Sequence, residues 1–131
     1  MAMKKYYINN LTLVSSEYKF TKPDPKLISI DVYDTIKVIE IHEKGVVLSV
    51  VRELNFGEGT NSFIKVEYEA NLESKSSETK ENILAALNAG ISELSVVFSK
   101  ISLLISQLTQ ASPFGVLVTA PTYNPKKAQI S

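Results

Sequence analysis

Few residues in this chain combine the types and the spacing that catalysis requires. His42 is the only histidine, so a catalytic triad or a facial metal site would lack the partners it needs. Asp31 and Asp34 stand three residues apart, which in a strand places the two carboxylates on opposite faces and argues against a shared proton. The sequence therefore predicts no enzyme, no metal site and no cofactor, and it predicts that His42→Ala leaves folding and activity intact.

Gly57 and Gly59 are similar to a phosphate-binding loop only in composition. No Gly-Lys-Ser or Gly-Lys-Thr follows them, and the next residues have the pattern of a strand rather than of a helix. The segment from Gly57 to Asn61 is therefore predicted to be a hairpin turn.

Three carboxylates, Glu67, Glu69 and Glu73, fall on one face of a predicted strand. A solvated sheet face explains their alternation with apolar residues, and a docking surface for a basic partner is the alternative. The aromatic residues are too dispersed to form a stacking platform for nucleic acid, and no basic residues alternate with them.

The composition indicates a single globular domain, residues 1–131. The chain is 44% hydrophobic and 21% charged, and its 14 basic residues balance its 14 acidic residues, so its net charge attracts neither nucleic acid nor an anionic membrane. It has no cysteine, no apolar leader segment, and no apolar run of the roughly 20 residues needed to span a bilayer. These features predict a soluble, cytoplasmic protein with no membrane insertion.

The elements that would position a site are a long helix and the sheet before it. Residues 77–112 predict one helix, because large apolar residues recur at alternating spacings of three and four and form a core-facing seam: Ile83, Leu87, Ile91, Leu94, Phe98, Ile101, Ile105 and Leu108. A second line at the same spacing consists of hydroxyl residues, which permit close approach of another backbone: Ser92, Ser95, Ser99, Ser102, Ser106 and Thr109.

Only a thin polar strip remains on this helix, at Glu93, Lys100 and Gln107. A helix that covers a sheet at a protein surface normally shows a polar half, so this helix should meet a second surface. We therefore expect a homo-oligomer, either a dimer or a dimer of dimers, or an apolar groove. A helix buried inside a larger domain is the alternative, although the chain has few other residues to surround it.

Four segments with strand patterns precede the helix. They predict an α+β fold in which residues 1–73 form a four-stranded antiparallel β-meander with the long helix packed on one face. The first segment is irregular and suits an edge strand with bulges, and the second changes parity near residues 37–39, which implies a further bulge. A hairpin turn at residues 43–45 leads to the third segment, in which Arg52 and Glu53 are expected to face outward.

The segment after the helix, residues 113–131, is predicted to be an extended crossover with a frayed tail from Asn124. An extended apolar segment without a sheet partner can bury side chains of a bound peptide and share its backbone hydrogen bonds. We therefore predict a polypeptide-binding groove between this segment and the helix. The residues assigned to it are Leu94, Phe98, Ile101, Phe114, Leu117 and Tyr123.

The run from Leu103 to Asn124 (LLISQLTQASPFGVLVTAPTYN), with Ala120 and Pro121 near its end, resembles the end of the long helix and the crossover of the bacterial protein-export chaperone SecB and its shorter relatives. The order of elements is similar to that family over most of the chain. The resemblance implies an antiparallel sheet with helices on one face and oligomers built through sheet edges and long helices. It also implies ATP-independent capture of unfolded polypeptide in apolar grooves.

The sequence departs from the typical export chaperone in three ways. It lacks the Cys and His of the zinc-binding tail that contacts the translocase motor, it shows no second long helix after Asn124, and it is not strongly acidic. These departures put delivery to a protein-export translocase in doubt. A relative with another client, such as the antitoxin of a toxin–antitoxin system, is equally open.

Two other classes of function remain open. In a helix-grip protein, a curved antiparallel sheet folds around a long helix and encloses a small-molecule pocket, but the apolar seam here lacks the converging polar groups of such pockets. A structural component of an oligomeric assembly is the third possibility. Co-purification of a small molecule or lipid would favour the pocket, whereas suppression of a client's aggregation would favour the chaperone.

Overall fold

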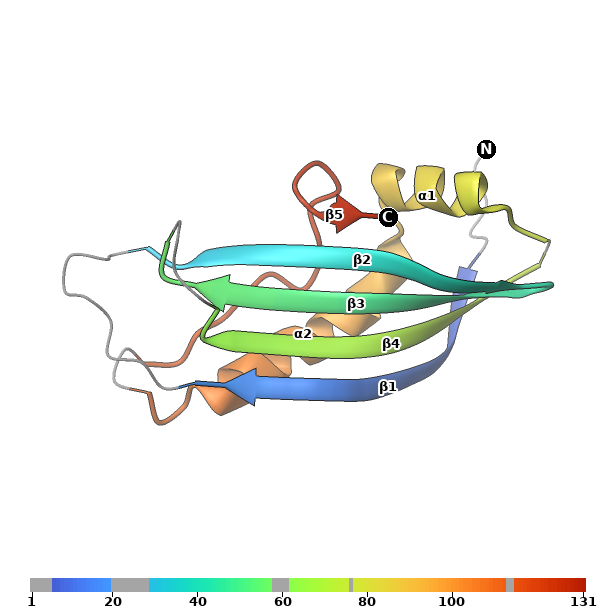
Figure 1. The fold of residues 1–131 in the computed structure, drawn as a ribbon. Coiled ribbons are helices and arrows are strands. Elements are labelled where there is room, and N and C mark those ends of the chain that lie inside the picture. Colours follow the sequence, from blue (N-terminus) through green and yellow to red (C-terminus); the bar gives the residue numbers. More distant parts are fainter. Residues whose placement is uncertain (1–5, 20–28, 58–61, 76, 113–114) are drawn as a thin grey trace.

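The structure, a computed structural model, describes residues 6–19, 29–57, 62–75, 77–112 and 115–131 (Figure 1). Its elements in chain order are β1 (Tyr6–Tyr18), β2 (Asp31–His42), β3 (Gly45–Asn55), β4 (Ile64–Ser74), α1 (Lys80–Ala89), the 3-10 helix η1 (Ser92–Leu94), α2 (Ser95–Leu108) and β5 (Gln129–Ile130). The crossover segment (residues 115–123) belongs to no strand and connects α2 to the turn before β5. The α+β class is confirmed, and α2 crosses one face of the sheet (Figure 1).

The sheet has the strand order β1-β4-β3-β2-β5, so the meander prediction holds only for β2, β3 and β4. β1 pairs antiparallel with β4 rather than with β2, and the two strands that are consecutive in sequence lie on opposite sides of the β3–β4 pair. As a consequence, β1 forms one edge of the sheet, and β2 with β5 forms the other.

The predicted strand irregularities appear as register shifts. β1 shifts against β4 between Ile8 and Asn10 and again between Leu13 and Ser15, and it is the edge strand that its sequence predicts. β2 shifts once against β3, at the place where its apolar alternation changes parity. At each shift an extra residue leaves the ladder, so the side chains that follow return to the face that buries them.

The single helix predicted for residues 77–112 is wrong, because the helix breaks at Gly90. Thr79 caps α1, with its Oγ1 accepting from the Asn82 N–H at 3.1 Å. Gly90 then adopts φ 104°, which residues with a side chain rarely adopt, and the two helical parts are bent by 72° relative to each other. Glycine therefore permits a bend that the apolar pattern does not reveal.

The apolar seam is buried on both sides of the break. Its residues pack with the inward side chains of β2, β3 and β4 in one core, and those that are no more than 5% exposed are Ile83, Leu87, Ile91, Leu94, Phe98, Ile101 and Ile105. The seam prediction is thus confirmed even though the helix that carries it is interrupted.

The expectation of a frayed tail from Asn124 is wrong. The N–H groups of Lys127 and Ala128 donate to the Asn124 carbonyl at 3.0 and 2.9 Å and close a turn. β5 then pairs parallel with the middle of β2, where Ser131 exchanges hydrogen bonds with Ile36 and Val38. The last residues therefore complete one edge of the sheet.

Within the described ranges, no single helix is long and apolar enough to cross a membrane. The pair formed by α1 and the stretch Ser92–Leu108 reaches the required length and apolarity only together, across the 72° bend.

Candidate polypeptide-binding site

The crossover segment lies extended along α2 and is bonded to it through side chains. Ser102 Oγ donates to the carbonyl oxygen of Thr119 at 2.7 Å, and Ser106 Oγ donates to that of Leu117 at 2.9 Å. The Leu117 N–H in turn donates to Thr109 Oγ1 at 2.9 Å. Part of the hydroxyl line of the helix therefore receives a backbone at close range, as predicted, but that backbone belongs to the same chain.

Arg52 fixes the end of the crossover segment from the sheet side. Its side chain is 1% exposed, and its guanidinium donates to both carboxylate oxygens of Asp34 at 2.7 and 2.8 Å. The remaining N–H groups donate to Thr119 Oγ1 at 3.0 Å and to the carbonyl oxygens of Ala120 and Thr122 at 2.6 and 3.0 Å. All five N–H donors of the guanidinium are therefore satisfied, which is what a buried cation requires.

The prediction that Arg52 faces outward is wrong. In β3 it lies on the same face as Val50 and Leu54, both buried, and its guanidinium carbon is 4.9 Å from the centre of the Phe98 ring. The alternation along the strand could have predicted the inward position, because Arg52 is two residues from each of these buried neighbours and so lies on their face. The partner Asp34 likewise has an inward parity on β2, opposite Arg52 in the ladder.

Tyr123 connects the end of the crossover segment to the helix break. Its hydroxyl donates to the Leu87 carbonyl at 2.7 Å and accepts from the Ile91 N–H at 2.9 Å, so it bridges backbone groups on the two sides of Gly90. The Tyr123 ring stacks on Phe98 with 5.5 Å between centroids. Burial raises the pKa of Tyr123 above its ordinary value, and the hydrogen bond from Ile91 opposes that rise.

The residues predicted to bind polypeptide belong to the core or to the crossover segment. Leu94, Phe98 and Ile101 are completely buried, Tyr123 is nearly so, and Leu117 is half-buried against the core. Phe114 lies outside the described residues. The structure therefore brings five of the six together in or against one core, where a client cannot touch the completely buried ones.

The exposed apolar side chains near this site belong to residues other than those predicted to bind polypeptide. Val116 is 52% exposed and Val118 is 81% exposed, while Leu117 and Thr119 between and after them face the protein. On α2, Leu103 is 59% exposed and Val96 is 49% exposed; the step of seven residues from one to the other corresponds to about 10 Å along the same side of the helix. None of these four residues is among those that the sequence assigned to the polypeptide-binding groove.

A hollow of about 610 Å³ lies where β1 begins and η1 meets α2. Its lining includes Tyr7 and Ile8 from β1, and Glu93 and Val96 from the helical side. The space between α2 and the sheet, where a helix-grip protein would enclose its ligand, is instead filled by core side chains. The arrangement thus favours contacts on the surface over a small-molecule pocket.

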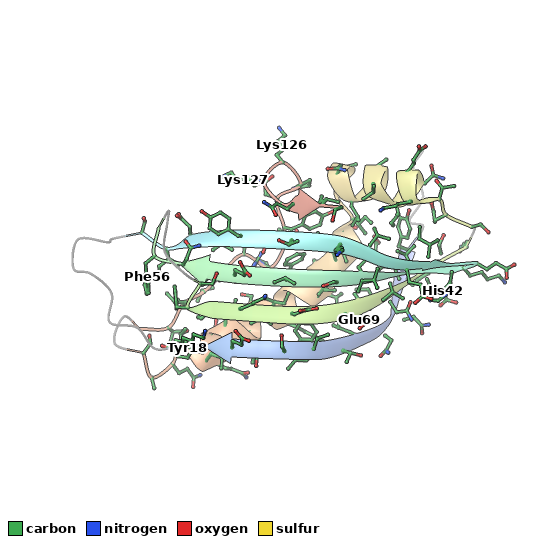
Figure 2. All side chains as sticks on the ribbon, in the orientation of Figure 1. Tyr18, His42, Phe56, Glu69, Lys126 and Lys127 are labelled. Carbon is green, nitrogen blue, oxygen red and sulfur yellow. The ribbon has the colours of Figure 1, made fainter. Side chains whose placement is uncertain are left out.

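The three predicted docking carboxylates share the face of the sheet that is turned away from α2, as Figure 2 shows for Glu69. Ser49 Oγ donates to Glu67 Oε2 at 3.2 Å, and Glu69 and Glu73 are exposed. The strand pairings place several further charged residues on this face, and the acidic ones predominate: Glu17, Asp31, Glu40 and Glu53, against Lys37 and Lys65.

His42 lies at the hairpin end of β2, far from the crossover segment (Figure 2). Its Nε2 is 3.5 Å from Glu40 Oε2, and both side chains are exposed.

Asp31 and Asp34 point to opposite faces as predicted, since only Asp34 pairs inward with Arg52. In the described part of the chain, no three His, Cys, Asp or Glu side chains are grouped to hold a metal ion. Gly59 lies outside the described residues.

The fold is similar to that of known structures, although no described protein family and no curated protein matches the sequence. One similar structure is the SecB-like chaperone of Mycobacterium tuberculosis in complex with a ChAD peptide from an antitoxin, with a TM-score of 0.63, 15% identity, and coverage of 88% of this chain and 90% of that one. Another, with a TM-score of 0.47 and 7% identity over 91% of this chain and 99% of the other, is a Streptococcus agalactiae protein of unknown function. The chain therefore has a SecB-like fold.

Proposed function

We propose that the protein captures extended apolar segments of unfolded polypeptide, without ATP, at the surface formed by the crossover segment and the adjoining side of α2. The observation that carries this proposal is the exposure of Val116 and Val118 on a segment that its own hydrogen bonds hold in place. Exposed valines on a fixed backbone lose little conformational freedom when a client covers them, so their burial contributes directly to affinity.

The surroundings of these valines support a polypeptide client. Lys100 is the only charged residue between Leu94 and Pro125, so α2 and the crossover segment offer a client almost no charge to desolvate. The SecB-like chaperone of M. tuberculosis, whose fold is similar, was solved with an antitoxin peptide. Protein export and toxin–antitoxin control are both processes that present unfolded chains of this kind.

The proposal moves the contact residues outward from those that the sequence suggested. The client contacts Val116, Val118 and Leu103, while Phe98 contacts the crossover segment from the core through Tyr123. The protein acts as a binding protein in this proposal and needs no catalytic group.

The test is the double variant Val116→Asp/Val118→Asp. A chemically denatured model protein is diluted into buffer, and its aggregation is followed by light scattering with and without the variant. We expect at least about tenfold weaker capture, because each valine contributes on the order of 1 kcal/mol or more when a client buries it. The melting temperature should stay within a few degrees of the unmodified chain, since both side chains are exposed.

The matched control is Ile39→Asp, which places the same charge at a 52% exposed apolar position on β2. It should capture the client as the unmodified chain does. Equal loss in the control and in the double variant would show that any added charge weakens capture, and the assigned surface would be wrong. Failure of the unmodified chain to suppress aggregation of any denatured client would refute the function itself.

A further inference from the structure

The two edges of the crossover segment differ in the hydrogen bonds of their main-chain groups. On the edge that faces α2, the Leu117 N–H and the Leu117 and Thr119 carbonyls are bonded to hydroxyls of the helix. In an extended chain the N–H and C=O groups of successive residues point to alternate edges. The main-chain groups of Val116 and Val118 therefore point to the other edge.

That outer edge is unpaired in the described part of the chain. The N–H and C=O groups of Val116 and Val118 bond to no described residue, and the segment belongs to no strand. The side chains of both residues are also exposed. Backbone groups without partners in an extended, exposed segment are a template for another strand.

The outer edge is preorganised for that pairing. Ser102, Ser106 and Thr109 hold the middle of the segment, and Arg52 holds its end through Ala120 and other acceptors. A chain that pairs with the edge therefore orders only itself and does not have to order the crossover segment as well.

We propose that the client adds as a β-strand to the outer edge of the crossover segment, through hydrogen bonds with the main chain of Val116 and Val118. This inference rests on the proposed function and specifies how the same surface recognises its client. The occupant is an extended polypeptide because only a backbone supplies N–H and C=O groups in alternation at strand spacing. Its central residues are apolar and uncharged, since they lie beside two valines in a segment without charge.

Recognition of this kind is independent of most side chains, which suits a protein that binds many unfolded sequences. It also sets a register, because every second residue of the client turns its N–H toward the crossover segment. A client with prolines at those positions should be rejected, since proline has no N–H to donate.

The experiment uses the unmodified chain and a short fluorescein-labelled peptide of alternating Val and Thr residues, flanked by Lys. Two versions carry backbone N-methyl groups, one on the Val residues and one on the Thr residues. We expect one version to bind at least about tenfold more weakly in fluorescence anisotropy, because it loses two or more main-chain hydrogen bonds. The other version should bind within about twofold of the unmethylated peptide.

Equal affinity of both methylated versions and the unmethylated peptide would overturn the strand pairing while leaving the proposed function intact. Equal loss in both versions would overturn it as well, because a paired strand has two different edges. Absence of binding by the unmethylated peptide and by denatured clients would instead refute the proposed function.

A second test changes the chain itself. Val118→Pro removes one N–H from the outer edge without breaking a hydrogen bond within the described residues, and Leu117 before it is already extended, as a residue preceding proline prefers. Val118→Ala trims the side chain but keeps the N–H. The proline variant should bind the peptide at least about fivefold more weakly than the alanine variant, with circular dichroism confirming that both are folded.

A second copy of the chain is the competing occupant of this edge. If Val118→Pro lowers the mass measured by light scattering and leaves the affinity for the peptide unchanged, the edge pairs with another copy and the proposal is wrong.

Discussion

The guanidinium of Arg52 is the point at which the sheet and the crossover segment are joined. It donates five hydrogen bonds, two to Asp34 and three to the crossover segment. Because the pair is buried, removal of one partner leaves the other charged and without compensation. The residue therefore contributes to stability through its position and not merely through its charge.

We predict that Arg52→Met lowers the free energy of unfolding by roughly 3 to 5 kcal/mol, measured by urea denaturation. The double variant Arg52→Met/Asp34→Leu should recover part of this loss, because it removes both buried charges, but the carbonyl of Ala120 remains without a donor. The control is Lys65→Met, whose Nζ is 3.7 Å from Glu53 Oε1 in an exposed pair, and it should cost no more than about 1 kcal/mol. A loss in Arg52→Met as small as in this control would contradict the role assigned to the buried pair.

Two buried tyrosines predict how stability depends on alkaline pH. Burial, with the nearby Glu78 charge and a hydrogen bond to Glu78, raises the pKa of Tyr6 to about 12, and burial raises the pKa of Tyr123. Both pKa values exceed the unfolded value of about 10, so the stability that the neutral hydroxyls contribute is fully present below pH 10. It is lost as the pH rises toward and through the folded values.

Urea denaturation between about pH 9 and about pH 11.5 should therefore show a falling free energy of unfolding. In the double variant Tyr6→Phe/Tyr123→Phe the fall should be smaller, although the variant starts from a lower stability because the Ile91 N–H loses its acceptor. An identical slope in both proteins would mean that other groups govern the alkaline transition.

At the scale of elements, the bend at Gly90 determines where α1 lies. The apolar seam continues across the bend, and Tyr123 bridges the backbone on its two sides. A straight helix and a bent one therefore fit the same apolar spacing. The bend occurs because Gly90 tolerates a positive φ.

Gly90→Ala should lower the free energy of unfolding by roughly 1 to 3 kcal/mol, because alanine is strained at φ 104°. The added Cβ would also lie 3.4 Å from Pro125 Cγ, a close contact. Ala89→Ser, at the exposed neighbouring position, should change stability by no more than about 0.5 kcal/mol. An unchanged or raised unfolding free energy in Gly90→Ala would show that the helix is straight at this point in solution.

The strands could be predicted from sequence more fully than the helices. Alternation and its changes of parity located β1 to β4 and their bulges, because each strand's own residues determine which face it buries. The order of the strands could not be predicted in the same way, since the pairing of β1 with β4 depends on contacts between distant segments. The break at Gly90 was concealed by an apolar spacing that fits either helix.

In the candidate site, too, local features could be predicted from sequence, whereas contacts between distant segments could not. The close approach of a backbone to the helix hydroxyls follows from their small size and regular spacing. The identity of that backbone does not, because Ser102 and Thr119 meet only when the chain has folded. The alternation of β3 places Arg52 on the inward face of the sheet, whereas a charged side chain is normally expected on the outward face. The inward position is possible because Asp34 lies on the same face and pairs with it.

At the scale of the whole molecule, β1 presents an outer edge that pairs with no described strand. Edge strands of this length are normally covered, twisted away or paired with another chain. We therefore predict a dimer or a dimer of dimers by light scattering at tens of micromolar. Val14→Lys, at an exposed apolar position of β1, should shift the distribution toward smaller species, whereas Val32→Lys on β2 should not. A monomer in the unmodified chain at these concentrations contradicts the prediction.

The acidic face of the sheet belongs to a chain whose total charge is zero. A basic partner can match Glu67, Glu69 and Glu73 only if their negative potential is not cancelled locally, and Lys37 and Lys65 are too few to cancel it. Since the basic and acidic residues are equal in number, the rest of the molecule must carry an equal excess of positive charge. Lys126 and Lys127, on the turn before β5, belong to that excess (Figure 2).

The acidic face therefore gives one side of the sheet an excess of negative charge, although the chain as a whole is neutral. A protein of this kind hardly migrates in a uniform electric field near neutral pH, where its net charge is close to zero. We nevertheless expect an anion exchanger to retain it, because the acidic face of the sheet can turn toward the resin, and we expect salt to release it through ionic screening. Near a positively charged surface, the acidic face of the sheet should therefore turn toward that surface, and the crossover segment, which lies along α2 on the other side of the sheet, should face away from it.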